Sequence, residues 1–240
     1  ERLCYTQRAM DKFSSKSLKE QVYDHLRGEI HRHRLRPGSA IHMDEISQSL
    51  GISRTPLRDA LMQLAVEGFV VISPRRGVAV NTLTLDDIRH SYQVIGALEG
   101  EALRTTVPRL TPTGIAGMRT LNARMAQAIA KGDFFRFYEH NLAFHDVYLR
   151  PCANPLLIDS VTSLKRRLYD FVSAKQWIRE WEEVSIGEHE RLVGFIEAGD
   201  GEGAAAYVRE VHWSFAVQEP FIRRYYFPEG TADIGKEKAR

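Results

Sequence analysis

The chain has 240 residues, 43% of them hydrophobic and 27% charged, a composition typical of a globular protein long enough for two domains. Its two cysteines, Cys4 and Cys152, lie far apart and argue against a disulfide framework. No apolar run approaches the ~18 residues of a membrane span. We therefore expect a cytoplasmic protein without a membrane partner.

The net charge of +2 is unevenly distributed. Residues 1–80 hold 13 Lys and Arg against 9 Asp and Glu, a net +4, whereas residues 81–240 hold 20 against 22, a net −2. A basic excess confined to one part of a chain indicates binding to nucleic acid.

Residues 1–14 lack apolar periodicity and are predicted to form a flexible arm. From Ser17, a helical period predicts a first helix, whose apolar face comprises Leu18, Val22, Tyr23, Leu26 and Ile30. The basic run 31–34 follows. It suits the negative end of the helix dipole, which we prefer over a dedicated phosphate patch.

Two further helices are predicted next. Residues 40–42 read as a short strand, 43–50 as a helix, and Gly51-Ile52 as the short turn between two crossed helices. Ser53 or Thr55 is suited to cap the third helix, and Pro56 fits its first turn. Its apolar face carries Leu57, Ala60, Leu61 and Leu64, and Gly68 ends it.

Two β-rich runs, 69–72 and 78–80, surround a Ser-Pro-Arg-Arg-Gly turn and predict a hairpin. Three helices followed by a small β-hairpin make residues 15–80 a winged helix-turn-helix domain. One recognition helix reads only a few base pairs, so such a domain favours a homodimer on a palindromic operator of double-stranded DNA.

Four arginines form the candidate DNA surface. Arg54 and Arg58 lie one turn apart at the helix N-terminus, and Arg75 and Arg76 lie at the hairpin tip. Any one of them alone is more often a solvated surface residue. All four in these places favour contacts to phosphates and base edges.

The β-rich runs end at residue 80, and residues 81–85 are predicted to be a linker. Thr84 and the acidic pair after it mark a helix start. Amphipathic segments then predict an all-α bundle of about six helices over residues 86–228, followed by a flexible tail at 229–240. The segments are 85–107, 112–131, 133–150, 154–174, 178–199 and 202–226.

A scattered set of polar residues is the candidate chemistry of this bundle. Asn141 and His145 share a helix face, and His189 and His212 follow on other predicted helices. Three imidazoles and one amide oxygen are able to converge on a divalent ion. From spacing alone, surface or hydrogen-bonded core histidines are the commoner explanation.

Residues 18–80 resemble the DNA-binding domain of the GntR family of bacterial transcription regulators. The resemblance rests on Arg36-Pro37-Gly38, Leu50 to Arg58, Ala60-Leu61, Leu64, Glu67-Gly68 and Pro74 to Gly77. It implies DNA contacts from Ser53, Arg54, Thr55, Arg58, Arg75, Arg76 and Gly77. Met43-Asp44 stand where some members carry a basic DNA-contacting residue at the start of the second helix.

Residues 86–226 resemble the FCD ligand-binding domain of the FadR branch of that family. The matching residues are 98–102, 141–145, 153–156, 188–189, 198–200, 204–205 and 211–212. The resemblance implies a metal held by Asn141, His145, His189 and His212, with Asn in place of a commoner Asp. Nitrogen ligands with one oxygen suit Zn²⁺, Ni²⁺ or Mn²⁺ better than Ca²⁺ or Mg²⁺. Ile95 stands where members that bind small carboxylates often carry Arg.

The sequence is therefore identified as that of a DNA-binding transcription regulator, a repressor rather than an enzyme, controlled by a small-molecule effector in its helical domain. The alternatives are a metal-dependent enzyme with a DNA-binding domain and an architectural DNA protein. No HExxH base motif supports the enzyme, since Glu188 and Glu190 point about 100° to either side of His189. The size of the second domain opposes an architectural protein.

Overall fold

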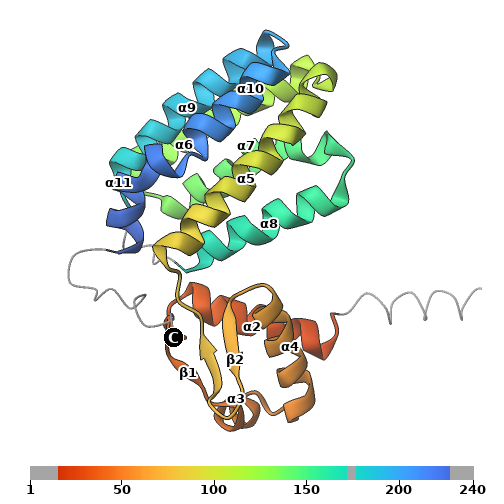
Figure 1. Cartoon of the computed structure of the whole chain (residues 1–240), viewed down its shortest axis with the longest axis vertical. Coiled ribbons are helices and arrows are strands. Elements are labelled where there is room, and N and C mark those ends of the chain that lie inside the picture. Colours follow the sequence, from red (N-terminus) through yellow and green to blue (C-terminus); the bar gives the residue numbers. More distant parts are fainter. Residues whose placement is uncertain (1–15, 172–176, 228–240) are drawn as a thin grey trace, which may run out of the picture. The chain divides into compact units, whose positions relative to one another are not determined.

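The computed structural model describes residues 16–171 and 177–227, and the chain divides into two compact units, residues 1–82 and 83–240 (Figure 1). The predicted arm at 1–14 and the predicted tail at 229–240 lie outside the described residues. Across the described part, no helix combines the length and apolar character that a bilayer crossing requires.

The first unit is a winged helix-turn-helix, as predicted. Its helices are α2 (Leu18–His31), α3 (Met43–Leu50) and α4 (Arg54–Val66), and its strands are β1 (Ala40–Ile41), β2 (Val70–Ser73) and β3 (Gly77–Val80). The strands form one antiparallel sheet in the order β1-β3-β2. The expected strand at 40–42 thus pairs with the wing, with Ala40 opposite Ala79.

Local signals define the helix ends in this unit. Ser17 and Glu20 form a reciprocal capping box at the start of α2. At the end of α4, Gly68 takes a left-handed φ of 79°, and the N–H groups of Gly68 and Phe69 bond to the carbonyls of Ala65 and Leu64. This Schellman arrangement turns the chain sharply, so that Phe69 packs into the core ahead of β2.

The second unit is a bundle of α-helices. They are α5 (Leu85–Thr106), α6 (Pro112–Lys131), α7 (Phe134–Leu149), α8 (Pro155–Asp170), α9 (Arg179–Glu197), α10 (Gly201–Tyr207) and α11 (Phe215–Tyr226). Short 3₁₀ turns follow α5 (η1, Val107–Arg109) and α7 (η2, Arg150–Cys152). Thr84 caps α5 through a capping box with Asp87, so Thr84 and Leu85 of the expected linker belong to this helix end.

The last predicted segment, 202–226, is not one helix. A π-helical turn, η4 (Val208–His212), follows α10, and the chain bends at Trp213-Ser214 before α11 begins. The bend places Trp213 against Gly96 of α5, and α5 packs on α7, α8, α10, η4 and α11 (Figure 1). Amphipathic spacing misses the π turn because a π turn changes the period only locally.

Candidate metal centre and DNA surface

Three histidines from three elements converge inside the helical unit. His145 comes from α7, His189 from α9 and His212 from the last residue of η4. Their ring centroids lie 5.1–5.4 Å apart, and one ring nitrogen from each falls within 4.8 Å of the others. The structure therefore brings together three imidazoles that the sequence analysis predicts on separate helices.

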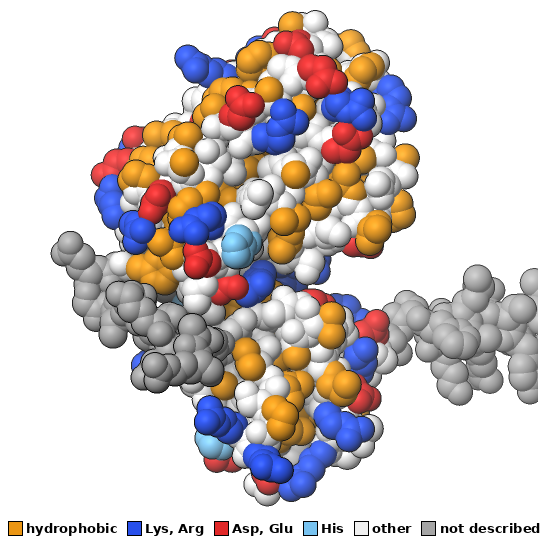
Figure 2. Space-filling view, in the orientation of Figure 1, with side chains coloured by type: hydrophobic (Ala, Val, Ile, Leu, Met, Phe, Trp, Pro, Cys, Tyr) orange, Lys and Arg blue, Asp and Glu red, His pale blue; other side chains and the backbone are white. Residues whose placement is uncertain are grey.

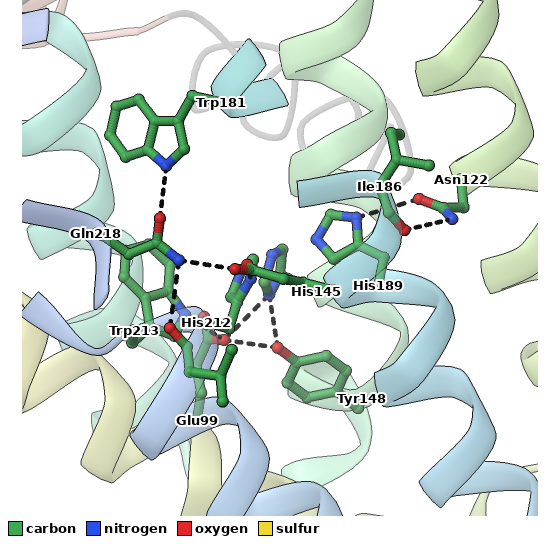
Figure 3. A network of polar contacts seen from close by, with 12 residues as sticks. Glu99, Asn122, His145, Tyr148, Trp181, Ile186, His189, His212, Trp213 and Gln218 are labelled. Atoms are coloured by element: carbon green, nitrogen blue, oxygen red, sulfur yellow. Dashed lines mark hydrogen bonds and ion pairs between the residues drawn. The ribbon is translucent and has the colours of Figure 1, made fainter. Parts of the chain in front are cut away.

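His145 is oriented by a buried carboxylate. Its Nδ1 donates to Glu99 Oε2 at 3.0 Å, and the same oxygen accepts from the Tyr148 hydroxyl at 2.6 Å and from Trp213 Nε1 at 2.9 Å (Figure 3). The other carboxylate oxygen pairs with the buried Lys165 ammonium. Burial opposes ionisation of Glu99, but the charge of Lys165 and the bond from His145 outweigh it and hold the pKa of Glu99 well below its usual value.

The other two histidines have oriented Nδ1 atoms as well (Figure 3). His212 Nδ1 donates to Glu188 Oε2 at 2.7 Å, and the second Glu188 oxygen accepts from Gln218 at 2.8 Å. His189 Nδ1 donates to the Asn122 side-chain oxygen at 3.2 Å. Asn122 faces this way because its amide nitrogen donates to Glu190 and to the Ile186 carbonyl.

Because Nδ1 of each ring is engaged, Nε2 is the nitrogen left for a ligand. Among the described residues, Nε2 of His145, Nε2 of His189 and Oδ1 of Asn141 are buried and have no hydrogen-bond partner. Burial lowers the pKa of His145 to about 4 and that of His189 well below its usual value, so both rings are neutral at pH 7. Neutral imidazole is the form that binds a metal.

Asn141 lies one turn before His145 on the buried face of α7 and, with His212, lines an internal cavity. All four candidate ligands therefore lie in one region of the unit. The sequence did not identify Glu99, Asn122 and Gln218 as their partners. Helical spacing cannot identify residues that meet across a bundle. Only two pairs in the family resemblance, Leu98-Glu99 and Glu188-His189, include residues of this hydrogen-bond network.

Neither carboxylate beside His189 is placed as a general base. Glu188 is engaged by His212 and Gln218. Glu190 is exposed and accepts from Arg119 and Asn122. The geometry fits a binding site rather than a hydrolytic one.

The predicted DNA-contacting residues occupy the two expected places on the first unit. Ser53 is the N-cap residue of α4 but makes no capping hydrogen bond with its side chain, and Arg54, Thr55 and Arg58 are exposed on the first turns. Arg54 pairs with Asp44 of α3 at 2.6 Å. Figure 2 shows Lys and Arg gathered at the end of this unit where Figure 1 places α3 and the β2–β3 turn.

The wing tip presents its two arginines on a strained turn. Arg76 N–H bonds to the Ser73 carbonyl across Pro74 and Arg75, and Arg75 has a φ of 66°. That conformation favours Gly, so Arg75 holds its backbone under strain at the tip of the turn. Gly77 follows with a φ of 83°, and both arginines are exposed.

A winged helix-turn-helix with basic side chains on its recognition helix and wing, followed by a helical unit with a buried histidine cluster, defines a DNA-binding transcription regulator. Comparison with known families supports this class. The model of the bacterial regulatory proteins of the gntR family matches residues 18–80, and the FCD domain model matches residues 90–212.

Relatives with known names cover most of the chain. The Nta operon transcriptional regulator of Aminobacter aminovorans is 27% identical over 177 residues, which are 72% of this chain and 80% of that protein. The solved structure of McbR/YncC from E. coli is 25% identical, with a TM-score of 0.61 over 87% of this chain and 96% of that one. A regulator structure from Rhodococcus sp. RHA1, 19% identical, shares the fold with a TM-score of 0.64 over 86% and 98%.

The chain therefore belongs to the GntR family of bacterial regulatory proteins, in the branch with a C-terminal FCD domain. It is a transcription regulator that binds DNA, and not an enzyme, as the family and these relatives establish.

Proposed function

We propose that the protein is a homodimeric repressor of a palindromic operator, and that a small effector bound beside a metal ion in the FCD domain controls its affinity for DNA. The observation that carries the proposal is the convergence of three imidazoles beside a cavity that Asn141 lines, with buried acceptor atoms that have no partner among the described residues. RspR of E. coli, 26% identical over 61% of this chain and 64% of its own length, is named a repressor.

The donor set fits a first-row transition ion. His145, His189 and His212 supply nitrogen and Asn141 supplies oxygen, a combination that suits Zn²⁺, Ni²⁺ or Mn²⁺. Asn141 is neutral. The carboxylates of Glu99 and Glu188 supply negative charge instead, through their hydrogen bonds to Nδ1 of His145 and of His212. His145, His189, His212 and Asn141 would hold the ion, which would supply Lewis-acid binding of an effector oxygen.

The same residues suggest how binding reaches the DNA-binding unit. The ligands come from α7, α9 and η4, so an ion and effector bound among them bias the packing of these elements. η4 packs against α5, which starts immediately after the boundary between the two units. An effector with different affinity for two arrangements of α5 shifts their populations and thereby the spacing of two recognition helices.

Metal analysis of the purified protein tests the proposal. We expect about one ion per chain in the wild type and far less in His189→Ala, while His90→Ala, which removes an exposed histidine of α5, serves as the matched control. At a free metal concentration of 100 times Kd, binding stabilises the fold by about 2.7 kcal/mol, a readily measured shift in Tm.

Two variants sharpen the test. Asn141→Asp should bind the ion at least about tenfold more tightly, because a carboxylate replaces a neutral amide at the ligand position. Asn154→Asp adds the same charge at the N-cap of α8, where Asp also caps, and should have no effect on metal binding. A wild type that stays metal-free after incubation with Zn²⁺, Ni²⁺ and Mn²⁺ contradicts the metal site, and the histidines then hold only water.

A further inference from the structure

The cavity next to the histidine cluster is lined mainly by aromatic rings. Tyr138 and Tyr169 approach to 4.8 Å between ring centroids, Tyr92 and Trp213 to 5.0 Å, and Trp181 and Tyr225 to 5.3 Å. Each ring of these three pairs also lines the cavity, and the pairs come from different elements around it. Aromatic faces carry negative electrostatic potential and attract cations.

The charged residues that line this cavity are all acidic in the described part of the chain. They are Glu182 and Glu188, and no Lys or Arg lines it there. Glu188 is engaged by His212 and Gln218, whereas Glu182 has no hydrogen bond or ion pair with any described residue. Burial raises the pKa of Glu182 to about 8, the expected behaviour of a carboxyl that lacks a positive partner.

Glu182 lies at a defined distance from the cluster along α9. It precedes His189 by seven residues, which places it on the same helix face and about 10 Å away at 1.5 Å per residue. His212 and Asn141 line the same cavity as Glu182 and Trp181. The cavity measures about 60 Å³.

From this arrangement we infer that the effector carries a small cationic group, an amine or methylated ammonium, held between the aromatic rings and Glu182. The inference rests on the proposed function, because it takes this cavity as the effector site. It sets the effector class apart from simple organic acids, for which the cavity offers no lining Lys or Arg among the described residues. Ile95, at the position where Arg is common, is fully buried in the core.

A second hollow between α7 and α8 does carry basic residues. Lys165 and Arg150 line it together with Arg166. Lys165 is paired with Glu99, and Arg150 with Asp146 at 2.9 Å. These two pairs neutralise much of the positive charge that an anionic effector requires, so the aromatic cavity is the stronger candidate.

Three probes of nearly equal shape separate charge from size. Choline is cationic, 3,3-dimethylbutan-1-ol replaces its nitrogen by carbon and is neutral, and 3,3-dimethylbutyrate is anionic. Binding of each to the full chain is followed by titration calorimetry, and by fluorescence because Trp181 and Trp213 line the cavity. We expect choline to bind about tenfold or more tightly than either isostere, as a desolvated cation among aromatic rings should.

Matched variants assign the preference to the cavity. Glu182→Gln should bring choline close to its neutral isostere, and Trp181→Leu should weaken it. Glu183→Gln removes the neighbouring exposed carboxylate, which pairs with Arg179, and should change nothing. Equal or tighter binding of 3,3-dimethylbutyrate, the absence of choline binding at millimolar concentration, or an unchanged choline preference in Glu182→Gln overturns the inference.

The same protein preparations are assayed for zinc content, so the two proposals fail separately. Loss of the choline preference with zinc bound overturns only the cationic effector. A metal-free protein that still prefers choline overturns only the metal site.

Discussion

In each histidine of the cluster, one ring nitrogen makes a hydrogen bond to a neighbouring side chain. Glu99, Asn122 and Glu188 hold the Nδ1 atoms, which fixes the tautomer of each ring and directs Nε2 inward. In an ordinary structural role, a buried imidazole uses both nitrogens. Here Nε2 of His145 and Nε2 of His189 have no hydrogen-bond partner among the described residues. These two free nitrogens favour a bound ligand between the rings.

The ion pair between Asp44 and Arg54 leads to a prediction on DNA binding. Both side chains are exposed, so the pair adds little to stability, on the order of 0–1 kcal/mol. Asp44 instead holds a negative charge beside an arginine expected to contact phosphate. Asp44→Asn should raise affinity by about two- to fivefold for a DNA fragment selected by the wild type.

The salt dependence of DNA binding tests whether Arg54 of the Asp44→Asn variant gains a phosphate contact. If Arg54 gains a phosphate contact, the slope of log K against log salt steepens by about 0.9. Glu45→Gln, at the next position of α3, is the control for charge alone. An affinity no higher than that of the control would show that Asp44 does not restrain Arg54.

The Glu182 carboxyl predicts a pH dependence of stability. Its folded pKa of about 8 lies above its ordinary value of 4.5, so the unfolded chain ionises first as pH rises. The free energy of unfolding therefore falls between about pH 4.5 and 8. Tyr92, Tyr169 and Tyr225, which face Glu182 from α5, α8 and α11, are neutral because burial raises their pKa values.

Glu182→Gln removes this loss. Relative to wild type, its free energy of unfolding should rise on going from pH 5 to pH 8, by about 1–3 kcal/mol in urea titrations. Glu183→Gln should follow the wild type at both pH values. Parallel stability curves for Glu182→Gln and wild type would show that the carboxyl is not held protonated by burial.

At the scale of elements, the sequence predicted the winged helix almost completely, because caps, Gly turns and apolar periods are local signals. Ser17, Gly68 and the Ser-Pro-Arg-Arg-Gly turn each act within a few residues of themselves. The π turn before Trp213 is different. It depends on the approach of α5, where an added Cβ at Gly96 would lie 3.1 Å from Trp213 Cβ, and one at Gly100 would lie 3.2 Å from the Ala205 carbonyl. Such tertiary contacts leave no periodic trace.

This close packing predicts opposite effects for two glycine substitutions. Gly96→Ala should push the Trp213 segment away, move His212 and weaken zinc binding, with a loss of stability of about 1–3 kcal/mol. Gly117→Ala in α6 meets open space and should gain about 0.5–1 kcal/mol from helix propensity. Thermal unfolding with and without zinc measures both. If Gly96→Ala behaves like Gly117→Ala, the glycine does not set the position of η4.

At the level of the whole molecule, the proposed palindromic operator requires two recognition helices, and we expect the FCD unit to join them. The small first unit uses most of its apolar positions for its own core. Residues 83–240, which form a compact unit, should sediment as a dimer at micromolar concentration. A monomeric fragment beside a dimeric full chain would instead place the contact on the first unit, where Met62 and Val66 are exposed one turn apart on α4.

The measurement that tests the central claim most directly is anomalous diffraction from crystals of the zinc-loaded protein, recorded on both sides of the zinc absorption edge. We expect one peak per chain among Nε2 of His145, His189 and His212 and Oδ1 of Asn141, with Nδ1 of the three rings still bound to Glu99, Asn122 and Glu188. A peak at those carboxylates or at surface histidines, with none inside the cluster, would contradict it.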